Sequence, residues 1–251
     1  MLKMALKNLV TVAVLTTSIS VFSAEVTVSA AASLTNAFKD IALNFEAEYP
    51  EHKVLLNFAG SGELLQQIAK GAPVDVFASA DQETMDKAQT QGLLNEASRK
   101  DFVRNTLVVI TPVDSTLELK AVEDLQQTAL QRLAISNPES VPVGRYSKQA
   151  LLDSNLWAVL ADKMINTQNV RQSLDYVARD EVDAGFVYAT DAAIMADKVK
   201  VQFTVPLNIV VSYPIAVTAE GSAKAVSQQF IDFVLNQQSQ AVLKGYGFSQ
   251  P

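Results

Sequence analysis

Two serines stand where their side chains and the backbone around them could together bind an anion. Ser33 and Ser61 each follow a strand-like apolar run and precede a helix-like pattern, and we expect each to cap the helix that it begins. The first N–H groups of a helix lack intrahelical partners and the helix dipole is positive at that end, so helix N-termini attract anions. Ordinary capping is the alternative interpretation of either serine, and the two roles are compatible.

Other reactive arrangements are scarce. The sequence has no Cys and a single His, His52, which excludes disulfides, thiolate metal sites and His-cluster metal sites. Residues 59–62 read Ala-Gly-Ser-Gly, but they lack the outer glycines of a nucleophile elbow and the Gly-Lys-Ser/Thr end of a P-loop. These observations exclude Cys nucleophiles and leave His52 as the single candidate base for any Ser-His mechanism. An exported serine hydrolase using Ser33 or Ser61 with His52 as base is the alternative from another functional class, although we expect His52 to be an exposed residue before a strand.

Composition and charge narrow the class of protein further. The chain has 251 residues, 49% of them hydrophobic, which suffices for one large core or two modest ones. It carries 20 basic and 27 acidic residues and no basic run, which argues against a nucleic-acid partner.

The first 23 residues have the pattern of a secretory signal peptide. Lys3 and Lys7 precede an apolar stretch from Leu9 to Phe22 that contains Thr and Ser, and small residues follow. Cleavage is expected after Ser23, with Ala24 as the alternative. The stretch is too polar for a membrane span, so the sequence predicts a soluble exported protein.

The elements that would position the serines alternate between strands and helices. Strands are predicted at residues 25–29, 53–58 and 74–78, with helices starting at Ser33, Ser61 and Asp81. The second half continues with strands at 106–111, 132–136 and 184–188, helices capped by Asn169 and starting near Asp191, a β-rich segment at 209–219 and a helical C-terminus from about residue 223. This alternation predicts an α/β protein with parallel or mixed sheets, in which ligands collect at the carboxyl ends of the strands.

Several segments in this order resemble the periplasmic molybdate-binding proteins of bacterial ABC transporters. The segments are Ala30–Ala37, Phe58–Ser61, Gly71–Asp81, Asn137–Gly144, Asn169–Arg171, Gly185–Tyr188 and Tyr213–Val217. The resemblance extends from about Val26 to Phe248. It implies a two-lobed periplasmic-binding-protein fold of type II, with mixed sheets flanked by helices and the ligand in the cleft between the lobes. The lobes would comprise residues 24–105 plus 214–251, and residues 106–213.

The resemblance also implies a set of ligand contacts, all of them uncharged. They fall on Ser33 and Ser61 through hydroxyl and backbone N–H, on Val143 and Val170 through backbone N–H, and on Tyr188 through its hydroxyl. Val143 stands where Ala is more frequent in the family, and Gly60 stands where Ser is frequent. Arg145 and Arg171 adjoin these positions and could clamp an anion, but we expect them to pair with nearby acids.

The implied function is high-affinity capture of molybdate, and of tungstate, with delivery to an inner-membrane permease and its cytoplasmic ATPase. The resemblance implies no enzyme, no cofactor and no direct protein–metal ligands, because the molybdenum would be bound as an oxyanion through the same five residues. The protein would be a periplasmic monomer. A receptor for sulfate or another oxyanion is the alternative within the same class.

Overall fold

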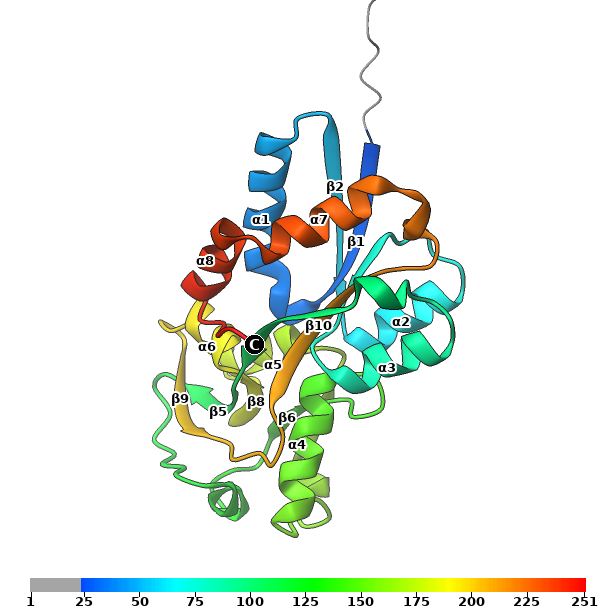
Figure 1. Cartoon of the computed structure of the whole chain (residues 1–251). Helices are drawn as coiled ribbons and strands as arrows, with labels where there is room; N and C mark the ends of the chain where they lie inside the picture. Colours follow the sequence, from blue (N-terminus) through cyan, green and yellow to red (C-terminus); the bar gives the residue numbers. More distant parts are fainter. Residues whose placement is uncertain (1–23) are drawn as a thin grey trace, which may run out of the picture.

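The computed structural model describes residues 24–251 and contains two lobes, each built on a five-stranded mixed sheet (Figure 1). The predicted signal peptide at residues 1–23 lies outside the described residues. The two sheets flanked by helices confirm the predicted α/β two-lobed fold class. Within residues 24–251 no helix is both long and apolar enough to cross a membrane.

The first lobe, in the upper part of Figure 1, has the strand order β2-β1-β3-β10-β4. Its elements are β1 (Ala24–Ala31), α1 (Thr35–Glu48), β2 (His52–Ala59), α2 (Ser61–Ala69), β3 (Val76–Ala78), α3 (Gln82–Thr90), β4 (Lys100–Asn105), β10 (Val211–Val217), α7 (Ala225–Leu235) and α8 (Gln237–Gly245). Helices cover both faces of this sheet. In β3, Val76 belongs to the core that contains Phe38 of α1 and Phe230 of α7, whereas Phe77 packs with residues of α2 and α3.

The second lobe has the order β7-β6-β8-β5-β9. Its elements are β5 (Leu107–Pro112), β6 (Leu133–Ser136), α4 (Pro142–Asp153), β7 (Met164–Thr167), α5 (Val170–Ala178), β8 (Ala184–Tyr188), α6 (Ala189–Ile194) and β9 (Val199–Thr204). Both sheets share one plan, in which adjacent parallel strands are followed by a reversed strand and one further edge strand. The reversed strands, β10 and β5, each lie next to a crossover between the lobes.

The chain crosses between the lobes twice. The first predicted lobe boundary, between Asn105 and Thr106, coincides with the crossover from β4 to β5. The second, between Tyr213 and Pro214, falls inside β10. Because β10 pairs with β4 from the Val211–Asn105 pair onward, sheet pairing assigns residues 211–213 to the first sheet.

Three strands, β4, β7 and β9, have no counterpart among the strands predicted from sequence. All three lie at the edge of a sheet. Edge strands are paired on one side only and tolerate charged residues, such as Lys100 and Asp101 in β4, so their apolar pattern is weak.

Two predicted helix caps are confirmed. The side chain of Asp81 accepts a hydrogen bond from the N–H of Thr84 and begins α3. The side chain of Asn169 accepts from the N–H groups of Arg171 and Gln172 and begins α5. In both cases a short polar side chain replaces the missing intrahelical acceptor.

Candidate functional site

A small cavity lies where the carboxyl ends of the parallel strands of both lobes meet. It is lined by Ala31, Ala32, Ser33, Ala59, Gly60, Ser61, Ala80, Val141, Pro142, Val143, Asn169, Val170 and Tyr188. These residues end or follow β1, β2 and β3 in one lobe and β6, β7 and β8 in the other. All five residues predicted to contact ligand are among them, and every lining residue is uncharged. The cavity is much smaller than pockets that hold extended molecules, which favours a small ion.

Ser61 presents a hydroxyl whose proton is free for a ligand. The prediction that it caps its helix is wrong: Gly60 occupies the N-cap position of α2, without a side-chain cap, and Ser61 is the first helical residue. Its Oγ instead accepts a hydrogen bond from the backbone N–H of Ala80, at 3.0 Å. Since a hydroxyl that accepts from an N–H still has its own proton, Ser61 can donate into the cavity.

Ser33 is also not a helix cap. It lies in a 3₁₀ turn, Ala32–Leu34, and the N-cap of α1 is Leu34, which has no side chain able to cap. The Ser33 Oγ is 3.0 Å from the hydroxyl of Tyr213, a residue of β10. The capping predictions failed because both serine hydroxyls have partners far away in the sequence.

Val143 and Val170 contribute backbone N–H groups from the first turns of α4 and α5. Val170 is the first residue of α5, and Asn169 caps the two following N–H groups but not that of Val170. Val143 follows Pro142, the first residue of α4, and α4 has no side-chain cap. Such first-turn groups have no intrahelical acceptor, so both remain available to an anion.

Tyr188 ends β8 with its side chain only 1% exposed. Among residues 24–251 no atom forms a hydrogen bond with its hydroxyl, although that hydroxyl is buried. Burial raises the pKa of Tyr188 well above its ordinary value, so the group keeps its proton. A buried donor of this kind is costly unless a ligand accepts its hydrogen bond.

Arg145 and Arg171 flank the cavity but are occupied by other partners, as predicted. Arg145 of α4 forms an ion pair with Asp81 in the first lobe, at 2.6 Å, and its Nη2 donates to the Thr84 hydroxyl. Arg171 of α5 forms an ion pair with Asp191, at 2.6 Å. Neither arginine lines the cavity, so charge neutralisation of a bound anion would come from dipoles and hydrogen bonds.

The lobes are in contact on both sides of the cavity, as expected of a closed state. The N–H of Gly62 in α2 donates to the carbonyl of Ser140 in the second lobe, at 2.8 Å. A Cβ added to Gly62 would lie 2.6 Å from that oxygen, so only glycine permits this approach. A Cβ on Gly60 would lie 3.1 Å from the Val141 side chain, a tight contact.

The geometry rules out a hydrolase based on His52. His52 is the first residue of β2, and Ser61 follows the opposite end of that strand, roughly 25 Å away at the usual rise per residue. Ser33 follows β1, which pairs in register with β2, and therefore lies at the same distant end. His52 is also not exposed as predicted, because its ring is partly buried and stacks on Phe45.

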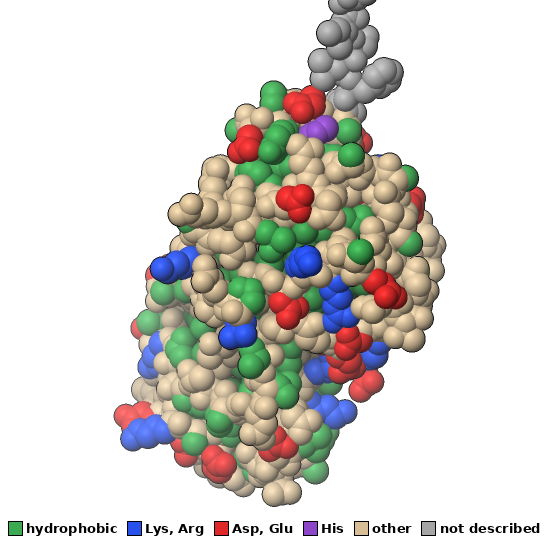
Figure 2. All heavy atoms as spheres, in the orientation of Figure 1, with side chains coloured by type: hydrophobic (Ala, Val, Ile, Leu, Met, Phe, Trp, Pro, Cys, Tyr) green, Lys and Arg blue, Asp and Glu red, His purple; other side chains and the backbone are tan. Residues whose placement is uncertain are grey.

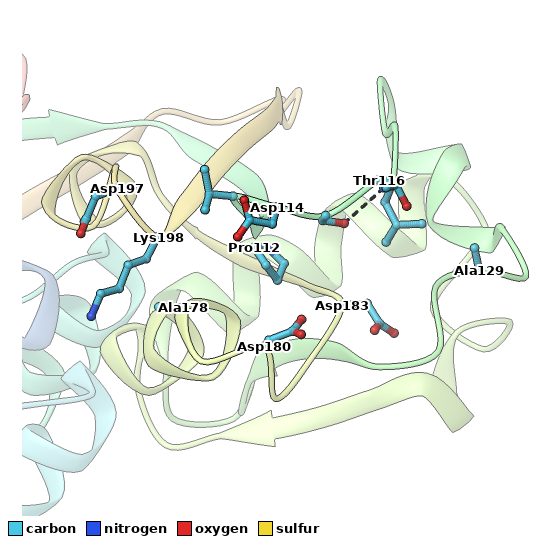
Figure 3. Close-up of a pocket in the computed structure, with 12 residues that line it drawn as sticks. Pro112, Asp114, Thr116, Ala129, Ala178, Asp180, Asp183, Asp197 and Lys198 are labelled. Carbon is cyan, nitrogen blue, oxygen red and sulfur yellow. Dashed lines mark hydrogen bonds between the residues drawn. The ribbon is translucent and has the colours of Figure 1, made fainter.

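A larger groove on the second lobe has the opposite chemistry. Figure 3 shows Asp114, Asp180 and Asp183 around it, with Asp197 and Lys198 at one side. Its empty space is about 1260 Å³, but its carboxylates would repel an anion. Elsewhere on the surface, the face in Figure 2 shows acidic and basic side chains interspersed rather than gathered into a basic patch.

Comparison with known proteins agrees with this site. Residues 26–249 match the family described as bacterial extracellular solute-binding protein. The molybdate-binding protein ModA of Escherichia coli (strain K12) is 39% identical over 231 residues, which are 90% of this chain and 89% of the relative.

Solved structures share the two-lobed fold. The periplasmic molybdate-binding protein of Azotobacter vinelandii has a TM-score of 0.80 at 25% identity, covering 90% of this chain and 99% of that one. The sulfate-binding protein SubI of Mycobacterium tuberculosis H37Rv has a TM-score of 0.79 at 14% identity, covering 90% and 87%, and this likeness concerns the fold alone. The chain belongs to the bacterial extracellular solute-binding proteins and is a relative of the molybdate-binding protein ModA.

Proposed function

We propose that this protein binds molybdate in the cavity between its lobes and delivers it to an ABC permease. The observation that carries the proposal is the composition of the cavity, which offers hydrogen-bond donors from both lobes and no charged side chain. The proposed contacts are the hydroxyls and N–H groups of Ser33 and Ser61, the N–H groups of Val143 and Val170, and the Tyr188 hydroxyl. The names of the sequence relatives support molybdate as the ion.

A cavity of donors matches a fully deprotonated oxyanion. The oxygens of molybdate only accept hydrogen bonds, so hydroxyls and helix N-terminal N–H groups satisfy them without a buried counter-charge. Each bond to a charged group contributes about 1.5–3 kcal/mol. About seven such bonds, reduced by the costs of dehydration and lobe ordering, can reach the −8 to −12 kcal/mol of micromolar to nanomolar binding.

The same cavity discriminates among anions. Hydrogen phosphate carries a proton that needs an acceptor, which a pocket of donors does not supply, at a cost of about 1–3 kcal/mol or more. Sulfate is fully deprotonated but smaller, so it cannot reach donors held on two closed lobes. Tungstate has nearly the size of molybdate and is proposed as a second ligand.

Location and partners follow from the same proposal. The signal-like residues 1–23 would direct the chain to the periplasm, where it acts as a monomer. The proposed partner is an inner-membrane permease with a cytoplasmic ATPase, as for substrate-binding components of ABC transporters. We propose that the lobes move about the two crossovers, near Asn105 and β10.

Calorimetric titration of the purified protein with molybdate, tungstate, sulfate and phosphate tests the function. We expect tight and similar binding of molybdate and tungstate, weaker sulfate binding and the weakest binding for phosphate. Sulfate as the tightest ligand would make the protein a sulfate receptor. Tight phosphate binding would contradict a cavity of donors. Small-angle scattering with and without molybdate should show a smaller radius of gyration with ligand, and identical curves would indicate a rigid pocket.

A further inference from the structure

The hydroxyl of Ser33 is the end of a hydrogen-bond chain that begins at the first crossover. The backbone N–H of Thr106 donates to Oδ1 of Asn105, at 2.9 Å. Nδ2 of Asn105 lies 3.2 Å from the Tyr213 hydroxyl and 2.8 Å from Oγ1 of Thr190. The Tyr213 hydroxyl in turn lies 3.0 Å from Oγ of Ser33, a contact in which either atom could be the donor.

The chemistry of these groups determines which atom donates in each of these hydrogen bonds. Because a backbone N–H only donates, the atom of Asn105 that faces Thr106 is the amide oxygen, and the amide nitrogen must face Tyr213. An amide nitrogen also only donates, so the Tyr213 oxygen accepts from it. Within residues 24–251, the one other hydrogen-bond partner of the Tyr213 hydroxyl is Ser33, which therefore receives the tyrosine proton.

Tyr213 is a permanent hydrogen-bond donor, and its ring is held in a fixed position. Its side chain is fully buried, and its ring packs edge-on against Phe102, Tyr188 and Phe248. Burial raises the pKa of Tyr213 well above its ordinary value, so the hydroxyl keeps its proton.

We propose that Tyr213 is a positioning residue that determines anion specificity by holding the Ser33 hydroxyl as a donor to the ligand. This inference rests on the proposed oxyanion-binding function. With a lone pair of Ser33 occupied by the Tyr213 proton, Ser33 directs its own proton into the cavity and offers little acceptor capacity to a protonated anion. Asn105, at the crossover, orients the Tyr213 hydroxyl.

Ser61 is held as a hydrogen-bond donor in the same way, but by a different kind of group. Ser61 accepts from the backbone N–H of Ala80, and so it too is held as a donor. The backbone group cannot be removed by a side-chain substitution, whereas the Tyr213 hydroxyl can. Tyr213 is therefore the position at which a substitution can restore an acceptor to the cavity.

The test replaces Tyr213 by Phe, which keeps the packed ring and removes the proton donor. Wild type and Y213F are titrated near neutral pH with the fully deprotonated oxyanion that wild type binds most tightly. Phosphate affinity is measured by competition against that anion. We expect Y213F to bind the deprotonated anion about tenfold more weakly and phosphate no more weakly, so that the ratio of the two affinities narrows by about tenfold or more. Asn105→Ala, which removes the group that orients Tyr213, should narrow the ratio in the same direction and by less.

Two comparison variants identify the cause. Tyr246→Phe removes a tyrosine hydroxyl that donates to Asp40 at the surface, and it should leave both affinities unchanged. Tyr188→Phe removes a proposed donor to the anion itself and should lower the affinity for both anions by a similar factor. If Y213F lowers the affinity for both anions by the same factor, or changes neither affinity, Tyr213 serves packing alone and the inference is overturned. If wild type prefers sulfate, the proposed molybdate function fails, while the sulfate-to-phosphate ratio still tests Tyr213.

Discussion

The two edges of the cleft are built differently, although each presents a serine to the same cavity. At the Ser61 edge the Ala80 N–H holds Ser61, and both the Gly62 N–H and the Arg145 side chain bond the opposite lobe. At the Ser33 edge side chains make the contacts, through Tyr213 and through Arg171. The Ser61 hydroxyl is therefore held by a backbone group and the Ser33 hydroxyl by a side chain, so different substitutions test the two serines.

The two flanking arginines also differ in what they connect. The Arg145 ion pair with Asp81 joins the two lobes, so separation of the lobes would break it. The Arg171 ion pair with Asp191 lies within the second lobe, and Arg171 reaches the first lobe through neutral acceptors, Oδ1 of Asn36 and the carbonyl of Ser33. We infer that Arg145 acts mainly on closure, whereas Arg171, through its buried partner Asp191, also supports the fold of its own lobe.

The largest expected effect is on folding, from Arg171→Met. The Asp191 side chain is 0% exposed, and removing its partner leaves a buried carboxylate unpaired. We expect the free energy of unfolding of the ligand-free protein to fall by about 3–5 kcal/mol, measured by urea denaturation. The double variant Arg171→Met/Asp191→Asn should recover much of the loss, and an unchanged urea midpoint in the single variant would contradict this role.

The same variant should show a defined pH dependence. Burial raises the pKa of Asp191 above its ordinary value, so the folded state binds a proton at this group more tightly than the unfolded chain does. Under linkage, such a group lowers stability as the pH rises through that pKa. The loss caused by Arg171→Met should therefore shrink as the pH is lowered toward that pKa.

Ser61→Ala and Ser33→Ala should each weaken molybdate binding by about 1.5–3 kcal/mol, or roughly ten- to a hundredfold. Each variant removes a donor to the ligand and strands a protein donor, the Ala80 N–H in one case and the Tyr213 hydroxyl in the other. Calorimetry gives the affinity, and circular dichroism checks that the fold is retained. Unchanged dissociation constants in both variants would refute the assignment of the serines.

Gly62→Ala should hinder closure of the lobes at the Ser61 edge. The added methyl group would lie 2.6 Å from the Ser140 carbonyl oxygen, and relieving such overlap costs about 1–3 kcal/mol. We expect molybdate affinity to fall accordingly and the ligand-induced decrease in radius of gyration to be smaller. Gly245→Ala is the matched control, because no atom beyond its chain neighbours and the backbone of its own helix lies within 4 Å of its added Cβ. Equal affinities for the two variants would show that this contact does not limit closure.

Arg145→Met should mainly accelerate ligand release. It removes a charge-assisted bond made across the lobes, while Asp81 retains bonds from the Ser79 hydroxyl and the Thr84 N–H. The dissociation rate of molybdate, followed by stopped-flow fluorescence, should rise by about tenfold, or ~1.4 kcal/mol. The urea midpoint of the ligand-free protein should change little, in contrast to Arg171→Met. A large loss of ligand-free stability would remove the distinction between the two arginines.

The smallest expected effect is that of alkaline pH on molybdate affinity. Burial raises the pKa values of Tyr188 and Tyr213 well above 10.0, so both hydroxyls remain donors at pH values where an exposed tyrosine begins to ionise. Affinity measured at about pH 7 and about pH 9.5 should therefore be the same. A decrease over this range would mean that one of these tyrosines is more accessible to solvent than its burial implies.

Local patterns in the sequence were sufficient for the central elements of the fold. The apolar runs that became β1, β5 and β8 are buried and were predicted, and the caps at Asp81 and Asn169 depend on neighbours within a few residues. The edge strands β4, β7 and β9 were not found, because a strand with only one neighbour does not require a continuous apolar pattern.

The candidate site was likewise predictable only in part. That Ser33 and Ser61 begin segments at the carboxyl ends of strands follows from residue order, and the resemblance to molybdate-binding proteins supplied Val143, Val170 and Tyr188. The partners of the serines could not be inferred, since the Ser33 hydroxyl meets a residue 180 positions away and the Ser61 hydroxyl one 19 positions away. Residue spacing along the chain determines periodicity and capping, whereas the direction of a hydroxyl proton depends on atoms that only the packed lobes bring together.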